Sequence, residues 1–363
     1  MQTKMNSDFN IDRLVRKNVA QMKPYSSARD EFKADGRKMT FLDANENPFD
    51  NGVNRYPDPQ QANLKSELAI QKGLREEHIL LGNGSDEVLD LLFRAFCSPG
   101  RDNIITLPPT YGMYKVLADL NEVENREIFL KKNFQPDVDT ILDEVDANTK
   151  LLFLCSPNNP TGNTFSEEAV LKLLNNFNGL LVIDEAYIDF SSQESWLKRL
   201  QEFPNLVITQ TLSKAYGQAG IRLGICYAST EIISILNKIK PPYNVNVLTQ
   251  QKALERLQAT EEVELEIKKI LGQKGFLEKE LSKISFVSEI FPSEANFLLA
   301  RVDNADQRYE QLLKKEIVVR NRSNQPLCEN TIRFTVGTMA ENIKLVKALQ
   351  EIEMNNQKEM ASK

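Results

Sequence analysis

A single histidine, His78, stands among the 363 residues of the sequence. This scarcity argues against a Ser-His-Asp catalytic triad and against a zinc site built from several histidines. Cysteine is also rare, and its four positions are widely spaced with no Cys-x-x-Cys pair: Cys97, Cys155, Cys226 and Cys328. Three of the four lie in or beside apolar runs, so we expect buried free thiols and neither disulfides nor metal ligands.

Long apolar runs and an excess of positive charge are missing as well. No run approaches the roughly 18 apolar residues of a membrane span, and the polar stretch Met1 to Asn10 lacks the apolar core of a signal peptide. A net charge of −6 gives no general attraction for nucleic acid or for anionic membranes. The composition, 41% hydrophobic and 26% charged, is that of a globular protein. We therefore expect a cytoplasmic protein that binds neither nucleic acid nor membrane.

Apolar runs alternate with helical patterns from about residue 62 onward. The predicted strands share a mostly continuous apolar character and lie at residues 79–81, 103–107, 151–155, 180–184, 206–209 and 225–228. Strands that are apolar on both faces are typical of a parallel sheet with helices on both sides. The sequence therefore predicts an α/β fold with a mainly parallel sheet.

The length of the chain suggests roughly two to three domains. Lys240-Pro241-Pro242-Tyr243 interrupts the alternation and is the candidate hinge. Beyond it, strand candidates at residues 297–301, 317–319 and 332–336 and a final helix from Glu341 predict a smaller α+β domain. We predict an N-terminal segment at 1–45 that associates with the smaller domain, a large domain at 46–245 and the smaller domain at 246–363.

Lys214 stands in a loop of small residues that follows the run at 206–209. Desolvation lowers the pKa of a lysine, and the neutral amine can condense with a carbonyl to form a Schiff base. Ser213 and Arg222 add a hydroxyl and a planar cation, which suit a phosphate. An aldehyde that carries a phosphate is pyridoxal phosphate. Most lysines only solvate the surface, so this hypothesis depends on the rest of the chain.

Other polar side chains follow the predicted strands where ligands of open α/β sheets bind, beyond the carboxyl ends. Asp184 ends one apolar run, and its burial would be costly without a cation such as a protonated pyridine nitrogen. Asn159 follows the preceding run, and Tyr187 follows Asp184. Both can donate hydrogen bonds to the phenolic oxygen of the cofactor ring. Three strand ends thus deliver an amide, an acid with a phenol, and an amine to one edge.

Three parts of the sequence have both a cofactor interpretation and a structural one. Gly84-Ser85-Asp86 opens a helix whose N–H groups suit a phosphate, although a plain helix cap explains it equally. Tyr111 could stack on a flat ring but could also simply pack. Asn159-Pro160-Thr161-Gly162 is by itself a turn signal. The combination of all these residues favours the cofactor.

Three motifs resemble those of fold-type I pyridoxal-phosphate aminotransferases: Asn159-Pro160-Thr161-Gly162, Asp184-x-x-Tyr187, and Ser213-Lys214 followed by Arg222. A narrower similarity, to the histidinol-phosphate aminotransferases, is carried by residues 45–48, 55–58, 182–187 and 333–338. The resemblance extends from about Pro24 to the C-terminus. It implies a large domain with a mainly parallel sheet of the seven-stranded type, a smaller α+β domain, and pyridoxal 5′-phosphate as the cofactor.

The resemblance also implies roles for individual residues. Lys214 would bind the cofactor covalently and move the proton, with Asp184 and Tyr187 as its catalytic partners. The implied cofactor-binding set is Ser85, Asp86, Tyr111, Asn159, Asp184, Tyr187, Ser213, Lys214, Arg222 and Tyr56. Tyr56 would reach the cofactor phosphate of the neighbouring subunit, so the resemblance implies a homodimer with shared sites.

The substrate-binding residues that the resemblance implies are Tyr25, Asn47, Arg320 and Arg333. Histidinol phosphate carries a phosphate and no carboxylate, whereas 2-oxoglutarate carries two carboxylates. Arginine forks accept either anion, and which arginine receives which anion is left open. For Arg320 the competing interpretation is a surface salt bridge, because Arg322 lies beside it.

The implied reaction is a reversible ping-pong transamination between L-histidinol phosphate with 2-oxoglutarate and imidazole acetol phosphate with L-glutamate. Aromatic-amino-acid aminotransferases and a threonine-phosphate decarboxylase share much of the pattern and stay as alternatives. A non-catalytic pyridoxal-phosphate-binding module of a regulator is the alternative of a different class. The lack of a basic surface or of an attached DNA-binding segment argues against that module.

Overall fold

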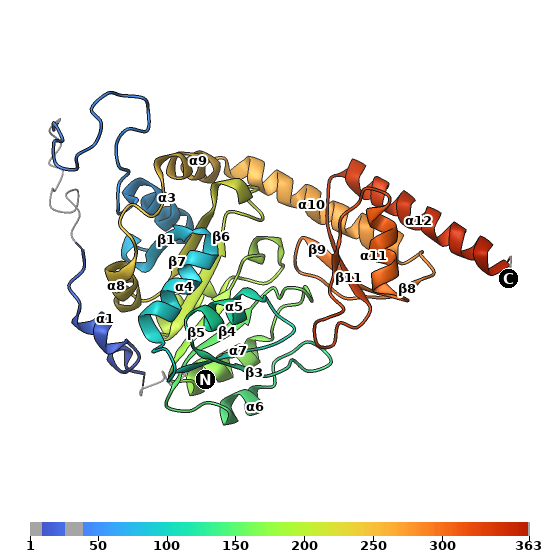
Figure 1. Cartoon of the computed structure of the whole chain (residues 1–363), viewed down its shortest axis with the longest axis horizontal. Coiled ribbons are helices and arrows are strands. Elements are labelled where there is room, and N and C mark those ends of the chain that lie inside the picture. Colours follow the sequence, from blue (N-terminus) through green and yellow to red (C-terminus); the bar gives the residue numbers. More distant parts are fainter. Residues whose placement is uncertain (1–8, 26–38, 362–363) are drawn as a thin grey trace.

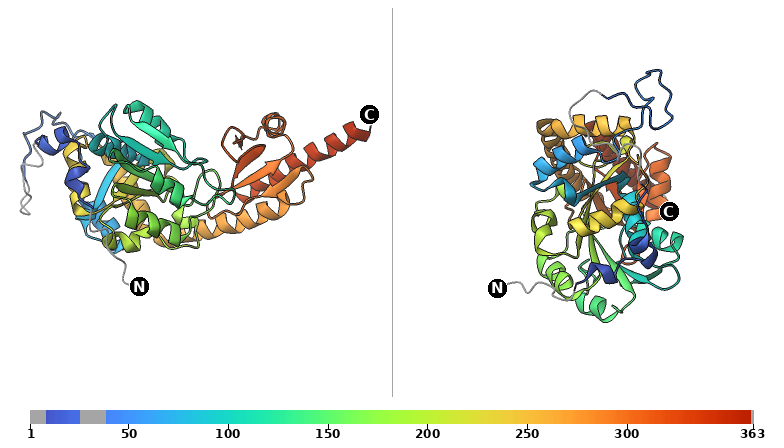
Figure 2. Two further views of the ribbon diagram at one scale, coloured as in Figure 1. Left: turned by 90° about the horizontal axis from the view of Figure 1, so that it is seen from below. Right: turned by 90° about the vertical axis from the view of Figure 1, so that its left-hand side faces the viewer.

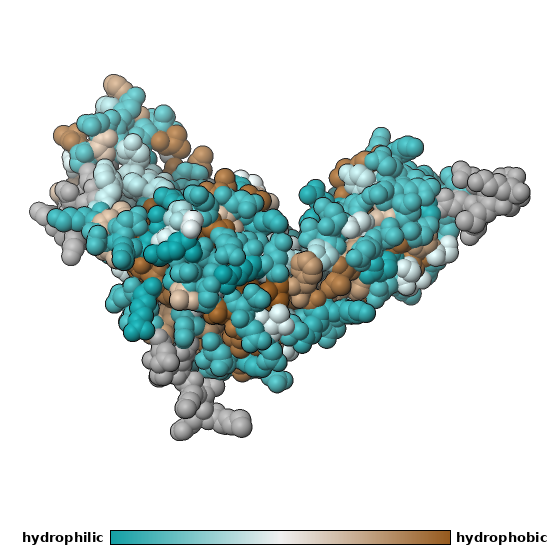
Figure 3. Space-filling model, turned by 60° about the horizontal axis from the view of Figure 1, so that its bottom comes forward, coloured by the Kyte–Doolittle hydropathy of each residue, from teal (hydrophilic) through white to brown (hydrophobic). Residues whose placement is uncertain are grey.

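The computed structural model describes residues 9–25 and 39–361. Figure 1 shows a large sheet with its helices at one end of the molecule and a smaller sheet at the other. The long helix α10 (Thr260–Leu281) runs from the larger part to the smaller one, as Figure 2 shows from two further sides. Figure 3 shows a deep notch between the two parts.

The large sheet has seven strands in the order β1-β7-β6-β5-β4-β2-β3. Their bounds are β1 Ile79–Asn83, β2 Asn103–Thr106, β3 Glu124–Glu127, β4 Thr149–Cys155, β5 Leu180–Asp184, β6 Leu206–Thr211 and β7 Leu223–Tyr227. β7 runs antiparallel to β1 and β6, and the other neighbours are parallel. The predicted mainly parallel sheet of an α/β fold is confirmed.

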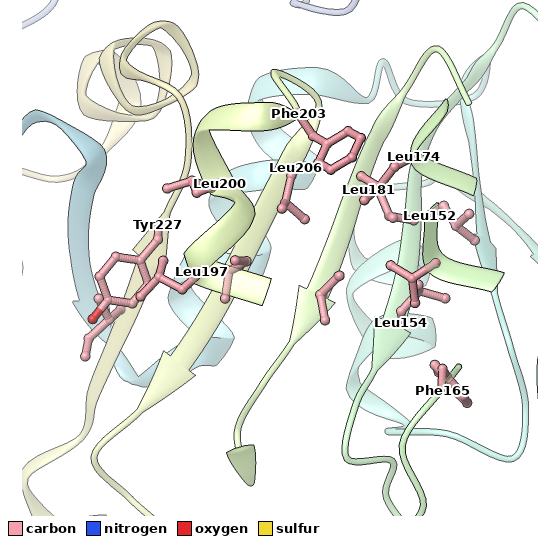
Figure 4. Close-up of a cluster of buried hydrophobic side chains, with 14 of the residues drawn as sticks. Leu152, Leu154, Phe165, Leu174, Leu181, Leu197, Leu200, Phe203, Leu206 and Tyr227 are labelled. Atoms are coloured by element: carbon pink, nitrogen blue, oxygen red, sulfur yellow. The ribbon is translucent and has the colours of Figure 1, made fainter. Parts of the chain in front are cut away.

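Helices cover both faces of this sheet because successive strand residues are apolar and alternate between the faces. Leu151 and Phe153 of β4 join the cluster under α4 (Gly84–Phe96), α5 (Met113–Leu120) and α8 (Thr230–Ile239). Leu152 and Leu154 join the opposite cluster, part of which Figure 4 shows. That second face packs against α3 (Ala62–Lys72), α6 (Val138–Asp143), α7 (Glu167–Asn176) and α9 (Val247–Gln258).

The smaller sheet is antiparallel, with the order β10-β11-β9-β8. Its strands are β8 Val287–Ile290, β9 Phe297–Val302, β10 Arg320–Asn321 and β11 Thr331–Thr335, and its other helices are α11 Ala305–Leu313 and α12 Met339–Ala361. A third apolar cluster lies between this sheet and its helices. The strand predicted at 317–319 is displaced, because the paired residues begin at Arg320.

Short helical turns complete the described chain: η1 Ile11–Arg13, α1 Lys17–Gln21, η2 Glu76–His78, η3 Ile188–Phe190, η4 Trp196–Glu202 and η5 Ala219–Ile221. The described residues 9–21 pack on the large-sheet side, and the association of the segment 1–45 with the smaller domain stays a prediction. Leu14 is buried in the cluster around α4, and the Arg16 N–H donates to the Ala95 carbonyl at 3.0 Å. Apolar contact with the larger core therefore places residues 9–21.

The domain division at 245/246 stays a prediction. Ala253 and Leu257 of α9 are buried in the core of the large sheet, so one helix beyond that division still packs on the first sheet. All four cysteines are buried and free, as expected. Among the described residues, none of the helices combines the length and the apolar character that crossing a membrane requires.

Candidate active site

The ends of β4, β5 and β6 lie side by side at one edge of the large sheet. In the register of the strands, Asp184 is opposite Cys155 on one side and Thr209 on the other. Asn159 follows β4, and Lys214 is the third residue after β6. The structure thus brings the amide, the carboxyl and the amine to the same edge.

Asp184 is a buried carboxyl, only 3% exposed. The Tyr114 hydroxyl donates to its Oδ2 at 2.8 Å, and the Ala186 N–H donates to its Oδ1 at 3.2 Å. Burial raises the pKa of Asp184 despite these donors. In the part of the chain that the structure describes, no lysine or arginine forms an ion pair with it. A protonated ring nitrogen fits this site as the missing cation.

Lys214 carries an exposed side chain, which differs from the buried lysine that its small neighbours suggested. Partial desolvation and the positive charge of Arg333 nevertheless lower its pKa, and Arg222 adds to the effect. Its Nζ lies 5.8 Å from the centroid of the Tyr187 ring. The amine is therefore accessible and easier to deprotonate than an ordinary surface lysine.

An apolar cluster joins the two sheets beside Lys214. Tyr187, after β5, meets Phe297 of β9 edge to face, with ring centroids 5.2 Å apart. The guanidinium carbon of Arg333, on β11, lies 5.1 Å from the centroid of Phe297. Arg333 Nη1 donates to Asn159 Oδ1. A cation of the smaller sheet thus reaches the strand ends of the larger one.

A glycine-lined cup forms where α4 begins. Gly84 has φ +75°, and its N–H donates to the Arg222 carbonyl at 2.9 Å. A Cβ on Gly224 would stand 2.2 Å from Ser85 N, so only glycine allows β7 to pass this close. Ser213, whose N–H donates to Thr211 Oγ1 at 3.1 Å, follows the strand beside β7. Backbone N–H groups at the start of α4, the hydroxyls of Ser85 and Ser213 and the guanidinium of Arg222 are donors that suit a phosphate.

Asp86 holds two of the predicted cofactor residues in place. Arg222 Nη2 lies 3.6 Å from Asp86 Oδ2, and the Tyr111 hydroxyl donates to Asp86 Oδ1 at 3.0 Å. Burial and the Asp86 charge raise the pKa of Tyr111. The Tyr111 ring stands edge-on to Tyr114 at 5.6 Å and is partly buried. Tyr111 therefore belongs to the border of the cup.

Three predicted site residues lie away from this group within one chain. Tyr25 is 71% exposed, and Tyr56 stacks on Tyr243 with ring centroids 4.5 Å apart. Asn47 accepts a hydrogen bond from the Phe49 N–H at 2.9 Å. The segment 39–58 that carries two of them projects from the larger part, far from the smaller sheet (Figure 1). A single chain therefore does not complete the predicted site.

The structure places two further residues beside the predicted ones. Tyr114 donates to Asp184 across 70 positions of sequence, and only its place three residues after Tyr111 hinted at a shared face. Arg322 stands two residues after Arg320, which pairs with Arg333 across β10 and β11. Strand alternation was the signal that could have placed Arg322 with the other two arginines.

The fold, with a lysine, a buried aspartate and a phosphate cup at one sheet edge, matches one protein class. The family model "Aminotransferase class I and II" matches residues 37–349, and the chain belongs to this family.

Within the family, two curated relatives are histidinol-phosphate aminotransferases. That of Christiangramia forsetii is 61% identical over 95% of this chain and 99% of its own length. That of Flavobacterium johnsoniae is 64% identical over 94% of this chain and 98% of its own length. The crystal structure of the Clostridium acetobutylicum histidinol-phosphate aminotransferase is 27% identical, with a TM-score of 0.77 over 84% of this chain and 92% of that one. The chain belongs with this group of the family.

Proposed function

We propose that the protein is a pyridoxal-phosphate-dependent transaminase that converts L-histidinol phosphate and 2-oxoglutarate reversibly into imidazole acetol phosphate and L-glutamate. The relatives of that activity are 61% and 64% identical to it over nearly the whole chain. The observation that carries the proposal is Asp184, a buried carboxyl that has no ion-pair partner among the described residues and lies at the same sheet edge as the accessible amine of Lys214.

The residues present offer partners for the ring nitrogen, the phenolic oxygen and the phosphate of pyridoxal phosphate. Asp184, held by the Tyr114 hydroxyl, would accept a hydrogen bond from the protonated ring nitrogen. Asn159 and Tyr187 would hold the phenolic oxygen. The phosphate would lie in the cup, against Ser85, Asp86, Ser213 and Arg222. When bound, the cofactor supplies an electron-withdrawing ring that stabilises negative charge on the reacting carbon.

Lys214 has two tasks in this proposal. Its Nζ, whose lowered pKa favours the neutral form, would be the nucleophile that holds the cofactor. The same Nζ would also serve as the base that takes up and gives back the proton at the substrate carbon. The first oxo product leaves before the second substrate binds, which gives ping-pong kinetics.

We propose that a second copy of the chain completes the site. Segment 39–58 exposes large apolar side chains, with Leu42 at 87% and Phe49 at 80%, which is costly for an isolated chain. In a homodimer this segment would bring Tyr56 to the partner's cofactor phosphate and Asn47 to its substrate, and Tyr25, which precedes the segment, would also reach a substrate. We also propose that the enzyme works in the cytoplasm.

The deciding experiment is a substrate panel on the purified, cofactor-loaded enzyme. Turnover should be fastest with histidinol phosphate and slower with phenylalanine, and threonine phosphate should release no carbon dioxide. Faster phenylalanine turnover would make the protein an aromatic-amino-acid aminotransferase, and carbon dioxide release would make it a decarboxylase. Glutamate alone should bleach the visible band of the bound cofactor, which a non-catalytic binding module would not allow.

Mixed dimers test the shared site. A mixed dimer contains one Lys214→Ala chain and one Tyr56→Phe chain. If Tyr56 acts across the interface, the site built on the Tyr56→Phe chain has both an intact Lys214 and an intact Tyr56 from the other chain. Activity above that of either variant alone is expected after mixing. A mixture no more active than its components would show that Tyr56 acts within its own chain or not at all.

A further inference from the structure

The two faces of the smaller sheet differ in chemistry. Asn321 and Ile332, which pair across β10 and β11, face the helices: the Asn321 amide donates to Asp306 of α11 at 2.6 Å, and Ile332 is buried in the cluster with α12. Their neighbours Arg320 and Arg333, also a cross-strand pair, therefore face away from the helices. Arg333 confirms that direction through its contact with Asn159 of the large sheet.

Arg322 continues the pairing between β10 and β11. Its N–H donates to the Thr331 carbonyl at 2.9 Å, two residues beyond the Arg320–Arg333 pair. Because side chains alternate along a strand, Arg322 lies on the same face as Arg320 and Arg333. These three arginines are called the arginine face below.

The arginine face lacks counter-charges of its own. Arg301, on the neighbouring strand β9, has two carboxylates nearby, Glu289 at 3.3 Å and Glu329 at 3.9 Å. Within the described residues no carboxylate forms an ion pair with Arg320, Arg322 or Arg333, and Nε of Arg322 and of Arg333 is buried without a hydrogen-bond partner.

Burial and the two neighbouring guanidinium groups lower the pKa of Arg322 to about 10. Burial likewise lowers the pKa of Arg333, with a contribution from Arg320. Like charges gathered without acids cost free energy, and a bound anion of two charges would remove that cost. The arrangement therefore points to a ligand that carries more negative charge than one carboxylate.

We propose that Arg322 is a substrate-binding residue which, with Arg320 and Arg333, makes a three-arginine site for a phosphate dianion. A phosphate monoester carries about −1.5 to −2 charges at neutral pH and three acceptor oxygens, whereas a carboxylate carries one charge and two oxygens. Two arginines suffice for a carboxylate, and the third selects the phosphate-bearing substrate. This inference rests on the proposed function for the identity of that substrate.

The chain after Arg322 supports its place beside the reacting groups. A turn in which the Gln325 N–H donates to the Arg322 carbonyl at 2.9 Å directs the chain across to the large sheet. There Gln325 helps to line a cavity of about 270 Å³ together with Tyr111 and Tyr114. Tyr114 is the residue that donates to Asp184. Arg322 thus anchors the segment of the smaller part that borders the catalytic edge.

Steady-state kinetics of Arg322→Gln test the selectivity. Loss of one charge-assisted hydrogen-bond partner should raise KM for histidinol phosphate about 10- to 100-fold and leave kcat within about threefold. KM for glutamate, which has no phosphate, should change less than about threefold. Arg322→Lys keeps the charge but not the fork and should recover part of the loss. Arg75→Gln, at a distant exposed arginine that forms an ion pair with Glu77, should match the wild type.

Binding of inorganic phosphate separates this inference from the proposed function. Calorimetry on the cofactor-loaded protein, whose cup is filled, should show phosphate binding that weakens about tenfold or more in Arg322→Gln. If phosphate binding weakens in Arg322→Gln but the wild type does not turn over histidinol phosphate, the proposed function is refuted while the anion site is supported. Unchanged phosphate affinity in Arg322→Gln, or equal rises in KM for histidinol phosphate and glutamate, would overturn the inference.

Discussion

The cup at the start of α4 and the arginine face of the smaller sheet both suit phosphates but are built in opposite ways. The cup uses backbone N–H groups and one guanidinium that is already balanced by Asp86. The arginine face uses three long side chains that form no ion pair with any carboxylate in the described part of the chain. Main-chain donors are fixed by the fold, whereas guanidinium groups can turn and reposition.

This difference follows from how long each ligand stays. A permanently held cofactor gains from a rigid, charge-balanced pocket that stays folded when empty. Two substrates that take turns, one with a phosphate and one with two carboxylates, need donors that adapt. The uncompensated charge of the arginine face then acts as a driving force for anion binding. Lys214 lies between the two regions, since its pKa is influenced by Arg333 and Arg222 together.

The largest effect is expected at Lys214. Lys214→Ala removes the side chain that we propose as both the nucleophile and the proton carrier, so kcat/KM should fall by at least about 10³-fold. Lys214→Arg keeps a cation between the two anion sites but has no neutral amine, and it should be equally inactive. The half-reaction with glutamate, followed by the visible band, measures both variants. Activity in Lys214→Arg near that of the wild type would show that only the charge matters.

Next in size is the effect of Gly224→Ala, which breaks the cup alone. The added Cβ would stand 2.2 Å from the Gly84 carbonyl carbon and from Ser85 N, and backbone atoms there cannot move aside. We expect a loss of about 3 kcal/mol of stability and weaker cofactor retention. Gly220→Ala is the matched control, because its Cβ would meet nothing within 4 Å. Denaturant unfolding and the cofactor content after dialysis report the outcome, and equal behaviour of both variants would contradict the rigid cup.

Arg333→Gln, the third prediction, acts on the arginine face and spares the cup. It removes a cation and the contact with Asn159, so KM for both histidinol phosphate and glutamate should rise about 10- to 100-fold. Cofactor content should stay at the wild-type level. If the cofactor were lost instead, Arg333 would serve the cup through Asn159, and the separation of the two regions would fail.

The two regions were also unequally predictable from sequence. Asn159, Asp184 and Lys214 follow buried apolar strands, and parallel strands deliver their carboxyl ends to one edge, so local runs were enough. The arginine face depends on the register between β10 and β11, and a shift of one residue would turn Arg320 and Arg322 toward the helices. Tyr114 escaped prediction for a similar reason, since its partner Asp184 is 70 positions away.

Edge strands and the projecting segment show the same limit. β3 and β8 were missed because their residues are partly exposed and polar, which removes the apolar run that marks a strand. Tyr56 was assigned through the family resemblance, and within one chain it stacks on Tyr243 instead. If Tyr56 acts in a second subunit, as proposed, its partners cannot be read from the pattern of a single chain.

The smallest effect is a pH dependence of the folding stability, which should arise beside the cup and not at the arginine face. Glu185, next to Asp184, is buried and accepts hydrogen bonds from the Trp196 N–H at 2.7 Å and from the Gln210 amide at 2.9 Å. Burial raises its pKa from 4.5 to about 7. A carboxyl with a raised folded-state pKa stabilises the fold fully below pH 4.5 and loses that contribution as pH rises through 7. Between pH 5 and 8 the loss should be about 2 kcal/mol.

Glu185→Gln stays neutral, so its unfolding midpoint should fall less than that of the wild type over this range. The arginine face should show no such trend, because Arg322, with a pKa of about 10, remains charged throughout. The matched measurement is the affinity for sulfate, an anion whose charge is constant from pH 6 to 8, on the cofactor-loaded enzyme. A parallel decline of stability in wild type and Glu185→Gln would remove Glu185 as the cause. A sulfate affinity that changes with pH in this window would mean that the arginine face also contains a titrating group.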